Sequence, residues 1–472
     1  MKKQCFNPYL PSWEYIPDGE PHVYGDRVYV YGSHDRFNGF AYCLNDYVCW
    51  SAPVNDLSDW QYEGVIYKKT EDPLNNDGHM CLYAPDVTKG PDGKYYLYYV
   101  LDKVPIVSVA VCDKPAGEYK FYGYVSYPDG TRLGERTGDQ PQFDPAVITE
   151  KSKTYLYTGF CGPGDKTRKG AMATVLAEDM LTIIEEPVFV IPGCCYSKGT
   201  GFEGYEFFEA PSIRKNGDTY YLVYSSISMH ELCYATSKYP TKDFVYGGVI
   251  ISNCDKHIGT YKKPEMVAYF GGNNHGGMEQ INGQWYIFYH RHTNGTSFSR
   301  QTCAAPIEIS ADGCISQVEM TSMGPGSKPL DAHGEYYTYI ACNLFVKDLE
   351  NTHPLHHESW IDGRFPIITQ EGRDGDEEVG YIANMRDGAI AGFKYFNFND
   401  VSKIIIKTRG YANGCMEIKT AWDGVALASI PIGYANIWTK NSADISIPSE
   451  VLPLYFEFKG DGAVSFASFE LE

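Results

Sequence analysis

The chain has 472 residues and a net charge of −20, from 40 Lys and Arg against 60 Asp and Glu. A charge of this sign disfavours nucleic acids and anionic membrane surfaces as partners. The length exceeds what one compact core usually contains, so the sequence predicts two domains.

The first residues, Met1 to Pro8, include two lysines but no apolar stretch after them, so no secretory signal is expected. No run of about 18 apolar residues occurs, and no membrane span is expected. The 14 cysteines lack zinc-type spacing and are expected to be reduced. Together these features predict a cytoplasmic protein.

A short tyrosine-rich pattern recurs five times in the first two thirds of the chain. Its central tyrosines are 67, 59, 66 and 65 residues apart, at Tyr29, Tyr96, Tyr155, Tyr221 and Tyr286. Turn sequences such as Asn282-Gly283 precede most copies and are typical of β-hairpins, whereas sustained helical periodicity is almost absent. Five repeated β units predict a five-bladed β-propeller over residues 1–319, with blades of four strands.

A carboxylic acid or a histidine stands 10 to 12 residues before each central tyrosine, at Asp18, Asp86, Asp144, Glu209 and His275. A proline lies within two residues of each of the four acids, and proline is typical of the first residue of a strand. The innermost strands of a propeller line its central channel. These five side chains are therefore predicted to converge at the mouth of the channel.

Several carboxylates around one axis raise each other's pKa, so one of them is expected to hold a proton near neutral pH. Glycoside hydrolysis needs such a pair, one carboxyl protonated and the other ionised. Glu209 lies between Phe208 and Ala210, an apolar setting that favours the protonated form, so it is the candidate general acid. Asp18 lies in the polar, turn-rich segment 17–21 and is the candidate general base.

Other polar motifs point to no separate chemistry. Residues 199–204 match the spacing of a dinucleotide-binding loop, but no helical pattern follows, so no organic cofactor is predicted. His275, in a glycine-rich segment, either fills the channel or is an axial ligand of an ion whose other ligands are water. Arg300 follows the last repeat as a single arginine.

The repeats stop near residue 318. Residues 320–333 are rich in Gly, Pro and Ser and are predicted to be a linker. Short apolar and alternating segments then continue to the end of the chain, and residues 334–472 are predicted to form a β-sandwich. Trp360 and Trp438 are either core residues or sugar-binding platforms.

Residues 7–11, 17–21, 25–29, 32–35, 83–86, 143–145 and 208–211 resemble glycoside hydrolase family 43. The resemblance covers about residues 5–318 and involves every repeat. It implies a five-bladed propeller that hydrolyses arabinosyl and xylosyl linkages with inversion. The second domain is similar to carbohydrate-binding modules of family 6.

The resemblance also implies a role for each candidate residue. Asp18 is then the general base, Asp144 the acid that tunes pKa values and orients its partners, and Glu209 the general acid. Asp86 is expected near the bound sugar and Arg300 in contact with it. His275 is similar to an axial histidine that often lies beside a calcium ion.

The sequence therefore predicts an inverting exo-glycosidase that releases terminal α-L-arabinofuranose from arabinoxylan-derived oligosaccharides. A β-xylosidase, or an enzyme with both activities, is the alternative within this class. A catalytically silent carbohydrate-binding protein is the rival from another class, and the register of the carboxylates argues against it. A protein-interaction propeller would instead have an apolar or basic channel mouth. The sequence leaves open endo or exo action, the oligomeric state and whether the second domain binds sugar.

Overall fold

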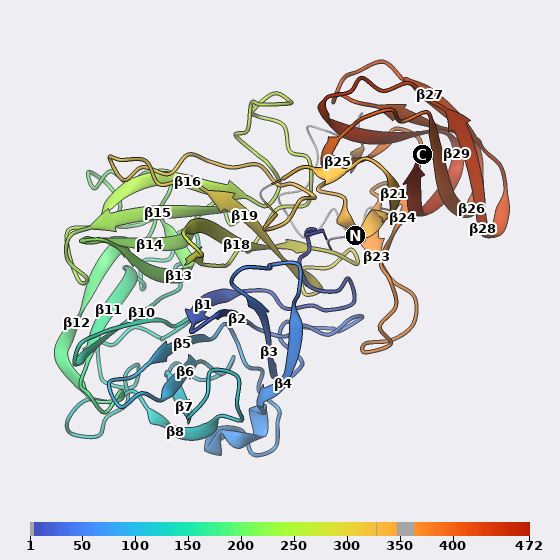
Figure 1. Ribbon diagram of the computed structural model, residues 1–472. Coiled ribbons are helices and arrows are strands. Elements are labelled where there is room, and N and C mark those ends of the chain that lie inside the picture. The colour runs from blue at the N-terminus through green and yellow to red at the C-terminus, as the bar shows by residue number, and fades with distance from the viewer. Residues whose placement is uncertain (1–3, 327, 347–362) are drawn as a thin grey trace.

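The computed structural model describes residues 4–326, 328–346 and 363–472, so Trp360 lies outside the described residues. Strands dominate the described chain, and the first domain consists of five small antiparallel sheets arranged as a propeller (Figure 1). Short 3-10 helices at Lys69–Glu71, Pro73–Asn75 and Thr338–Ile340 lie outside the sheets. The described residues contain no helix with the length and hydropathy that a membrane crossing requires.

Blades I to IV each contain four strands that pair in chain order. Blade I comprises β1 (Glu20–Tyr24), β2 (Arg27–Tyr31), β3 (Tyr47–Pro53) and β4 (Gln61–Tyr67). Blade II comprises β5 (Asp86–Lys89), β6 (Tyr95–Tyr99), β7 (Ser108–Cys112) and β8 (Lys120–Tyr124). Blade III comprises β9 (Ala146–Glu150), β10 (Lys153–Thr158), β11 (Gly170–Leu176) and β12 (Ile183–Pro192). Blade IV comprises β13 (Phe207–Asn216), β14 (Thr219–Ser226), β15 (Glu231–Ser237) and β16 (Val245–Ser252).

Blade V differs from the expected four strands. Its sheet contains β17 (Met278–Ile281), β18 (Gln284–His292) and β19 (Arg300–Ile307). The N-terminal segment lies beside β19, because the Asn7 side chain donates to the Ala304 carbonyl and accepts from its N–H, both at 2.9 Å. The chain start therefore closes the ring against its last blade.

The many tyrosines pack within and between the blades, where the ring is buried and the hydroxyl reaches a backbone carbonyl. Tyr31, Tyr98 and Tyr157 are fully buried. Their hydroxyls donate to the carbonyls of Pro115 at 2.8 Å, Met180 at 2.7 Å and Pro240 at 2.5 Å. A phenol contributes apolar area without leaving its oxygen unpaired, which explains the tyrosine content of these sheets.

The second domain has the character of a β-sandwich. Its strands are β20 (Leu330–Asp331), β21 (Gly334–Tyr337), β22 (Asn343–Val346), β23 (Ile367–Thr369), β24 (Tyr381–Met385), β25 (Ala389–Asn397), β26 (Lys403–Lys419), β27 (Ala428–Ile432), β28 (Ala435–Asp444) and β29 (Val451–Leu471). The long strands β26 and β29 pair along most of their length and connect the other strands. The segment predicted as a linker contains β20, which pairs in parallel with β25.

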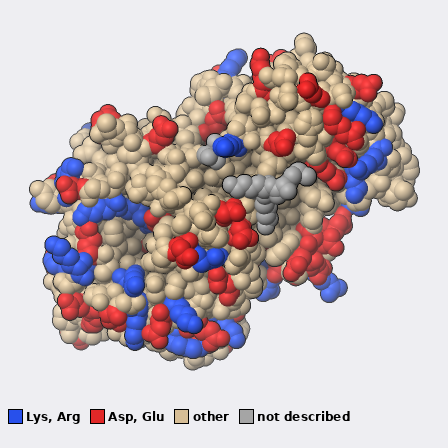
Figure 2. Space-filling model, viewed as in Figure 1, with Lys and Arg blue, Asp and Glu red and all other residues tan. Residues whose placement is uncertain are grey.

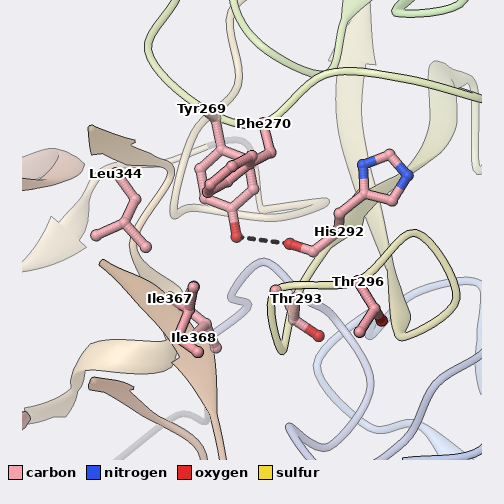
Figure 3. A pocket seen from close by; sticks show the side chains of 9 residues that line it. Tyr269, Phe270, His292, Thr293, Thr296, Leu344, Ile367 and Ile368 are labelled. Carbon is pink, nitrogen blue, oxygen red and sulfur yellow. Dashed lines mark hydrogen bonds between the residues drawn. The ribbon is translucent and has the colours of Figure 1, made fainter. Parts of the chain in front are cut away.

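The two domains meet over a seam that is partly apolar and partly charged. Tyr269 and Phe270 of the propeller and Ile367 and Ile368 of the sandwich line a small cavity of about 10 Å³. Figure 3 shows these side chains facing one another. A cavity of this volume holds at most about one water molecule. Elsewhere in the seam the buried Lys394 ammonium lies 3.0 Å from Asp255 and 2.9 Å from Glu319.

Figure 2 shows both acidic and basic side chains on this face of the molecule, and the acidic ones gather in several places on the right-hand part of the view. Trp438 of the second domain is partly exposed, and the Arg409 guanidinium lies 4.3 Å from its ring centre. That cation covers one face of the indole.

Candidate active site

A pocket of about 270 Å³ opens among the first strands of the blades. Five of the six predicted site residues line it, namely Asp18, Asp144, Glu209, His275 and Arg300. Aromatic walls surround these charges, from Tyr42, Tyr83, Phe143 and Phe208. The structure thus brings together side chains that are up to 282 positions apart in the sequence.

Asp18 lies two residues before β1, in a left-handed backbone conformation with φ of 57°. Its N–H donates to His290 Nδ1 at 3.4 Å, and its Oδ1 accepts from Arg300 Nη1 at 2.9 Å. Arg300 is held in turn by Asp35, through Nε to Oδ2 at 2.9 Å and Nη2 to Oδ1 at 3.0 Å. This bidentate pair fixes the guanidinium that faces the Asp18 carboxylate.

Asp144 also has a left-handed backbone, with φ of 44°, and lies two residues before β9. Its Oδ2 accepts the N–H of Ala210 at 3.2 Å, directly after Glu209. Burial, followed by the charges of Glu209 and Asp18, raises the pKa of Asp144 well above its usual value. The bond to Ala210 connects Asp144 to the backbone that carries Glu209.

Glu209 lies in β13 where the pairing with β14 is irregular, and Ala210 after it has φ of 64°. Strained backbone of this kind is common at functional sites. Burial and the nearby Asp18 raise the pKa of Glu209 to about 8, although the Arg300 charge acts in the opposite direction. Glu209 is therefore largely protonated at neutral pH, which a general acid requires.

His275 lies between the two aspartates, with Nδ1 3.8 Å from Asp18 Oδ1 and 3.7 Å from Asp144 Oδ2. Burial lowers the pKa of His275 to about 4, so the imidazole is neutral at pH 7. Calcium prefers six to eight oxygen ligands. This part of the pocket offers only the His275 nitrogen and the carboxyls of Asp18 and Asp144. These residues alone do not match a calcium site, and the calcium ligand role of His275 stays a prediction.

Asp86 does not line the pocket. It is the first residue of β5 and pairs with Tyr98, as Glu20 of β1 pairs with Tyr31. Both partners stand two positions after the central tyrosine of their repeat, so Asp86 and Glu20 lie in the same layer of the channel. Ala84, two residues nearer the mouth, lines the pocket in blade II.

The deeper layer that contains Asp86 is a network with a contribution from every blade. Asp86 Oδ1 is 2.6 Å from His22 Nε2, and its Oδ2 accepts the Val147 N–H at 2.7 Å. Arg214 donates to Glu20 and to Glu279, both at 3.0 Å. We refer to Glu20, His22, Asp86, Arg214 and Glu279 as the channel network.

Sequence reasoning missed several residues that shape the site. Asp35 lies in the segment 32–35 that contributed to the resemblance, but nothing in its spacing indicated that it would hold Arg300. Tyr42 lies in the connection between β2 and β3, outside the repeat pattern. His290 is fully buried beneath Asp18, and its Nδ1 accepts the Asp18 N–H.

The pocket is small and aromatic, and it lies on the axis of a five-bladed propeller. It sets a protonated carboxyl opposite an arginine-bound carboxyl, an arrangement typical of a glycoside hydrolase. The sequence pattern of the glycosyl hydrolases family 43 matches residues 15–315. The chain belongs to this family.

Similar proteins agree with this assignment. A "Xylosidase/arabinosidase" of Thermoclostridium stercorarium is 67% identical over 471 residues, which cover 100% of this chain and 99% of that protein. The crystal structure of a family 43 arabinoxylan arabinofuranohydrolase from Bacillus subtilis, in complex with cellotetraose, is 20% identical with a TM-score of 0.53. It covers 98% of this chain and 97% of that one, so both domains share its fold.

A second solved structure is a family 43 β-xylosidase/α-arabinofuranosidase from a compost microbial metagenome, in complex with xylotriose and in a calcium-free form. It is 27% identical with a TM-score of 0.51 and covers 66% of this chain and 96% of that chain.

Proposed function

We propose that this glycoside hydrolase removes terminal α-L-arabinofuranose from arabinoxylan-derived oligosaccharides by an exo-acting, inverting mechanism. The observation that carries this proposal is the pocket: it places the protonated Glu209 and the arginine-bound Asp18 together behind aromatic walls. A volume of about 270 Å³ is just below the range of about 300–1,000 Å³ for drug-sized ligands, which favours one terminal sugar over a length of polymer.

In this mechanism Glu209 donates its proton to the glycosidic oxygen as the bond from that oxygen to the anomeric carbon breaks. Asp18 takes a proton from a water molecule while the water oxygen bonds to the same carbon. One proton enters the leaving alcohol and one arrives on Asp18, and solvent exchange returns both carboxyls to their starting states.

The remaining residues prepare these two groups. Asp144 accepts the Ala210 N–H and thereby helps to orient the backbone that carries Glu209. Arg300 pairs with Asp18 and holds its carboxyl in place, and Asp35 in turn holds Arg300. Aromatic walls such as Phe143 and Phe208 suit the apolar face of a sugar ring.

Release of β-D-xylose is the second candidate activity. The relative that is 67% identical bears a name with both activities, and the two pentoses present similar hydroxyl patterns to a small pocket. We propose that the same two carboxyls serve both substrates. A catalytically silent binding protein would have no need for a protonated carboxyl set opposite an arginine-bound one.

The test compares hydrolysis of nitrophenyl α-L-arabinofuranoside and nitrophenyl β-D-xyloside by the wild type and D18A. Turnover of the arabinoside that is lost in D18A supports the proposed activity and base. A preference for the xyloside would favour the second candidate, and no turnover of either would favour a silent or endo-acting protein. Proton NMR of the first sugar released gives the anomer, and a retained configuration would exclude the inverting mechanism.

A further inference from the structure

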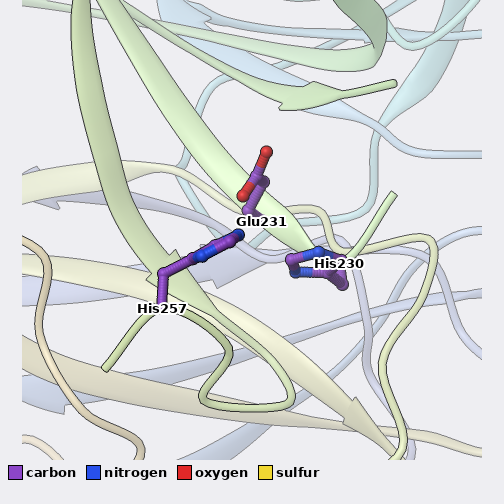
Figure 4. A group of neighbouring side chains, drawn as sticks. All are labelled: His230, Glu231 and His257. Carbon is purple, nitrogen blue, oxygen red and sulfur yellow. The ribbon is translucent and has the colours of Figure 1, made fainter. Parts of the chain in front are cut away.

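A second cluster of polar side chains lies outside the pocket, where blade IV approaches the loop that follows it. It contains His230 and Glu231, at the start of β15, and His257, in the loop after β16. One ligand atom from each of the three lies within 4.8 Å of the others. Figure 4 shows that the His257 ring extends toward Glu231 and His230.

The two buried members each use one polar atom for a contact with a serine. His230 Nδ1 lies 3.0 Å from Ser252 Oγ, and Ser226 Oγ donates to Glu231 Oε1 at 2.7 Å. Glu231 is 1% exposed, and its Oε2 is buried with no hydrogen-bond partner among the described residues. A buried carboxylate oxygen without a partner is costly, so its environment is incomplete as it stands.

We propose that His230, Glu231 and His257 bind a divalent transition metal ion, with zinc as the best match. Two imidazoles and one carboxylate form a ligand set typical of zinc, with water in the fourth position. Calcium would require many more oxygens. The serine contacts are the outer-shell bonds that orient metal ligands, and they leave His230 Nε2 and Glu231 Oε2 for the ion.

His257, the third ligand, lies at the solvent side of the proposed site. His257 is exposed, whereas His230 and Glu231 are buried, so an ion can enter from solvent on the His257 side. A spacing of up to 4.8 Å is wider than the spacing between ligand atoms around one zinc ion, so the ligand atoms have to move closer when the ion binds. His257 is the exposed member and has the most room to move.

The site lies next to the active-site wall. Met229, which precedes His230, lines the pocket, and its carbonyl accepts the Asn274 N–H at 2.8 Å. Asn274 Nδ2 also donates to the His230 carbonyl at 3.2 Å, and His275 follows Asn274. A bound ion would fasten the 226–231 turn to the 252–257 loop and steady this wall, without taking part in the reaction.

The experiment measures zinc binding to EDTA-treated full-length protein by titration calorimetry, together with the melting temperature. Wild type is expected to bind one zinc ion per chain at this site, with a higher melting temperature in zinc and little change in calcium. H257A is expected to weaken this binding at least about 10-fold, because it removes a ligand. E231Q, which keeps the volume and the Ser226 contact, is expected to weaken it similarly.

The matched control is H79A, since His79 is an exposed histidine beside an aspartate, with 78% of its side chain accessible, outside this cluster. H79A is expected to bind zinc as the wild type does. The exposed thiols Cys195 and Cys314 offer competing zinc sites. Both variants retain these thiols, so the difference in zinc binding between H257A and H79A reports the proposed site alone. Equal zinc binding by the wild type, H257A and E231Q would overturn the proposal, as would calcium binding that is tighter than zinc binding and is lost in H257A.

Discussion

Two layers of charged side chains follow each other along the propeller axis, and they differ in how their charges are paired. In the channel network, Arg214 pairs with Glu20 and Glu279, and Asp86 accepts hydrogen bonds from side chain and backbone. In the pocket, Arg300 is engaged by Asp18 and Asp35, whereas the Glu209 side chain has no hydrogen bond or ion pair with another side chain in the described part of the chain. The same residue types stabilise the ring where they are paired and are available for proton transfer where they are not.

The largest effect is expected from E209Q, which keeps the shape of the pocket but removes the acidic proton. We expect kcat/KM for natural oligosaccharides to fall by about 10²–10⁴-fold, the usual contribution of a general acid. The loss should be smaller for aryl glycosides whose leaving group needs little protonation. Near-native activity on oligosaccharides would remove Glu209 from this role.

R214M tests the deeper layer. Removal of the arginine leaves the buried Glu20 and the half-buried Glu279 without their cation, which should cost about 3–5 kcal/mol of folding free energy. The turnover of the folded fraction should stay within about twofold, since Arg214 does not line the pocket. Denaturant unfolding and active-site kinetics measure the two effects separately.

The control for R214M is R136M, because Arg136 forms an exposed ion pair with Glu186. Exposed pairs contribute about 0–1 kcal/mol, so R136M should change stability little. Equal losses in the two variants would show that the channel network is not a special source of stability.

D35N tests whether Asp35 holds the Arg300 guanidinium in place beside Asp18. With the bidentate pair weakened, the guanidinium is free to leave Asp18, and a misplacement of about 1 Å costs on the order of 10²-fold in rate. We expect the loss in kcat rather than in KM, at a temperature where circular dichroism shows the variant folded. An unchanged kcat would show that Asp35 serves stability alone.

The pH dependence of the rate follows from the raised pKa of Glu209, about 8. Activity should decline as pH rises through this value, because the general acid loses its proton. A kcat/KM profile of the wild type should show this alkaline limb, whereas the residual activity of E209Q should lack it. A wild-type profile that stays flat up to pH 9 would contradict this assignment.

A smaller effect on stability has the same origin. The pKa values of Glu209 and Glu20, each about 8, exceed the usual value of a glutamate, so the folded state binds more protons than the unfolded state. Their contribution to stability is present at acidic pH and is lost as pH rises through 8. The difference in melting temperature, E209Q minus wild type, should therefore be about 1–3 °C larger at pH 8.5 than at pH 5. Calorimetry at the two pH values measures it.

The repeat spacing was enough to predict the propeller, since a pattern that recurs every 59–67 residues has to reflect a repeated unit. The structure confirms this fold, with a last blade of three strands closed by the N-terminal segment instead of four. It also places Asp18, Asp144, Glu209, His275 and Arg300 at one pocket, whereas their catalytic roles stay predictions.

The sequence by itself determined which strand of each repeat carries a polar residue toward the axis. Only the tertiary structure decided the depth of each residue along that axis. Asp86 stands one residue nearer its central tyrosine than Asp18 does. The registers also differ by one residue: Asp86, opposite Tyr98, lies ten positions before the central tyrosine of blade II, whereas Glu20, opposite the equivalent Tyr31, lies nine positions before that of blade I. Because side chains alternate along a strand, this change of register puts Asp86 one layer deeper and leaves Ala84 at the pocket. The partners of Arg300 and the Glu209 pKa likewise depend on contacts between blades, which local sequence does not specify.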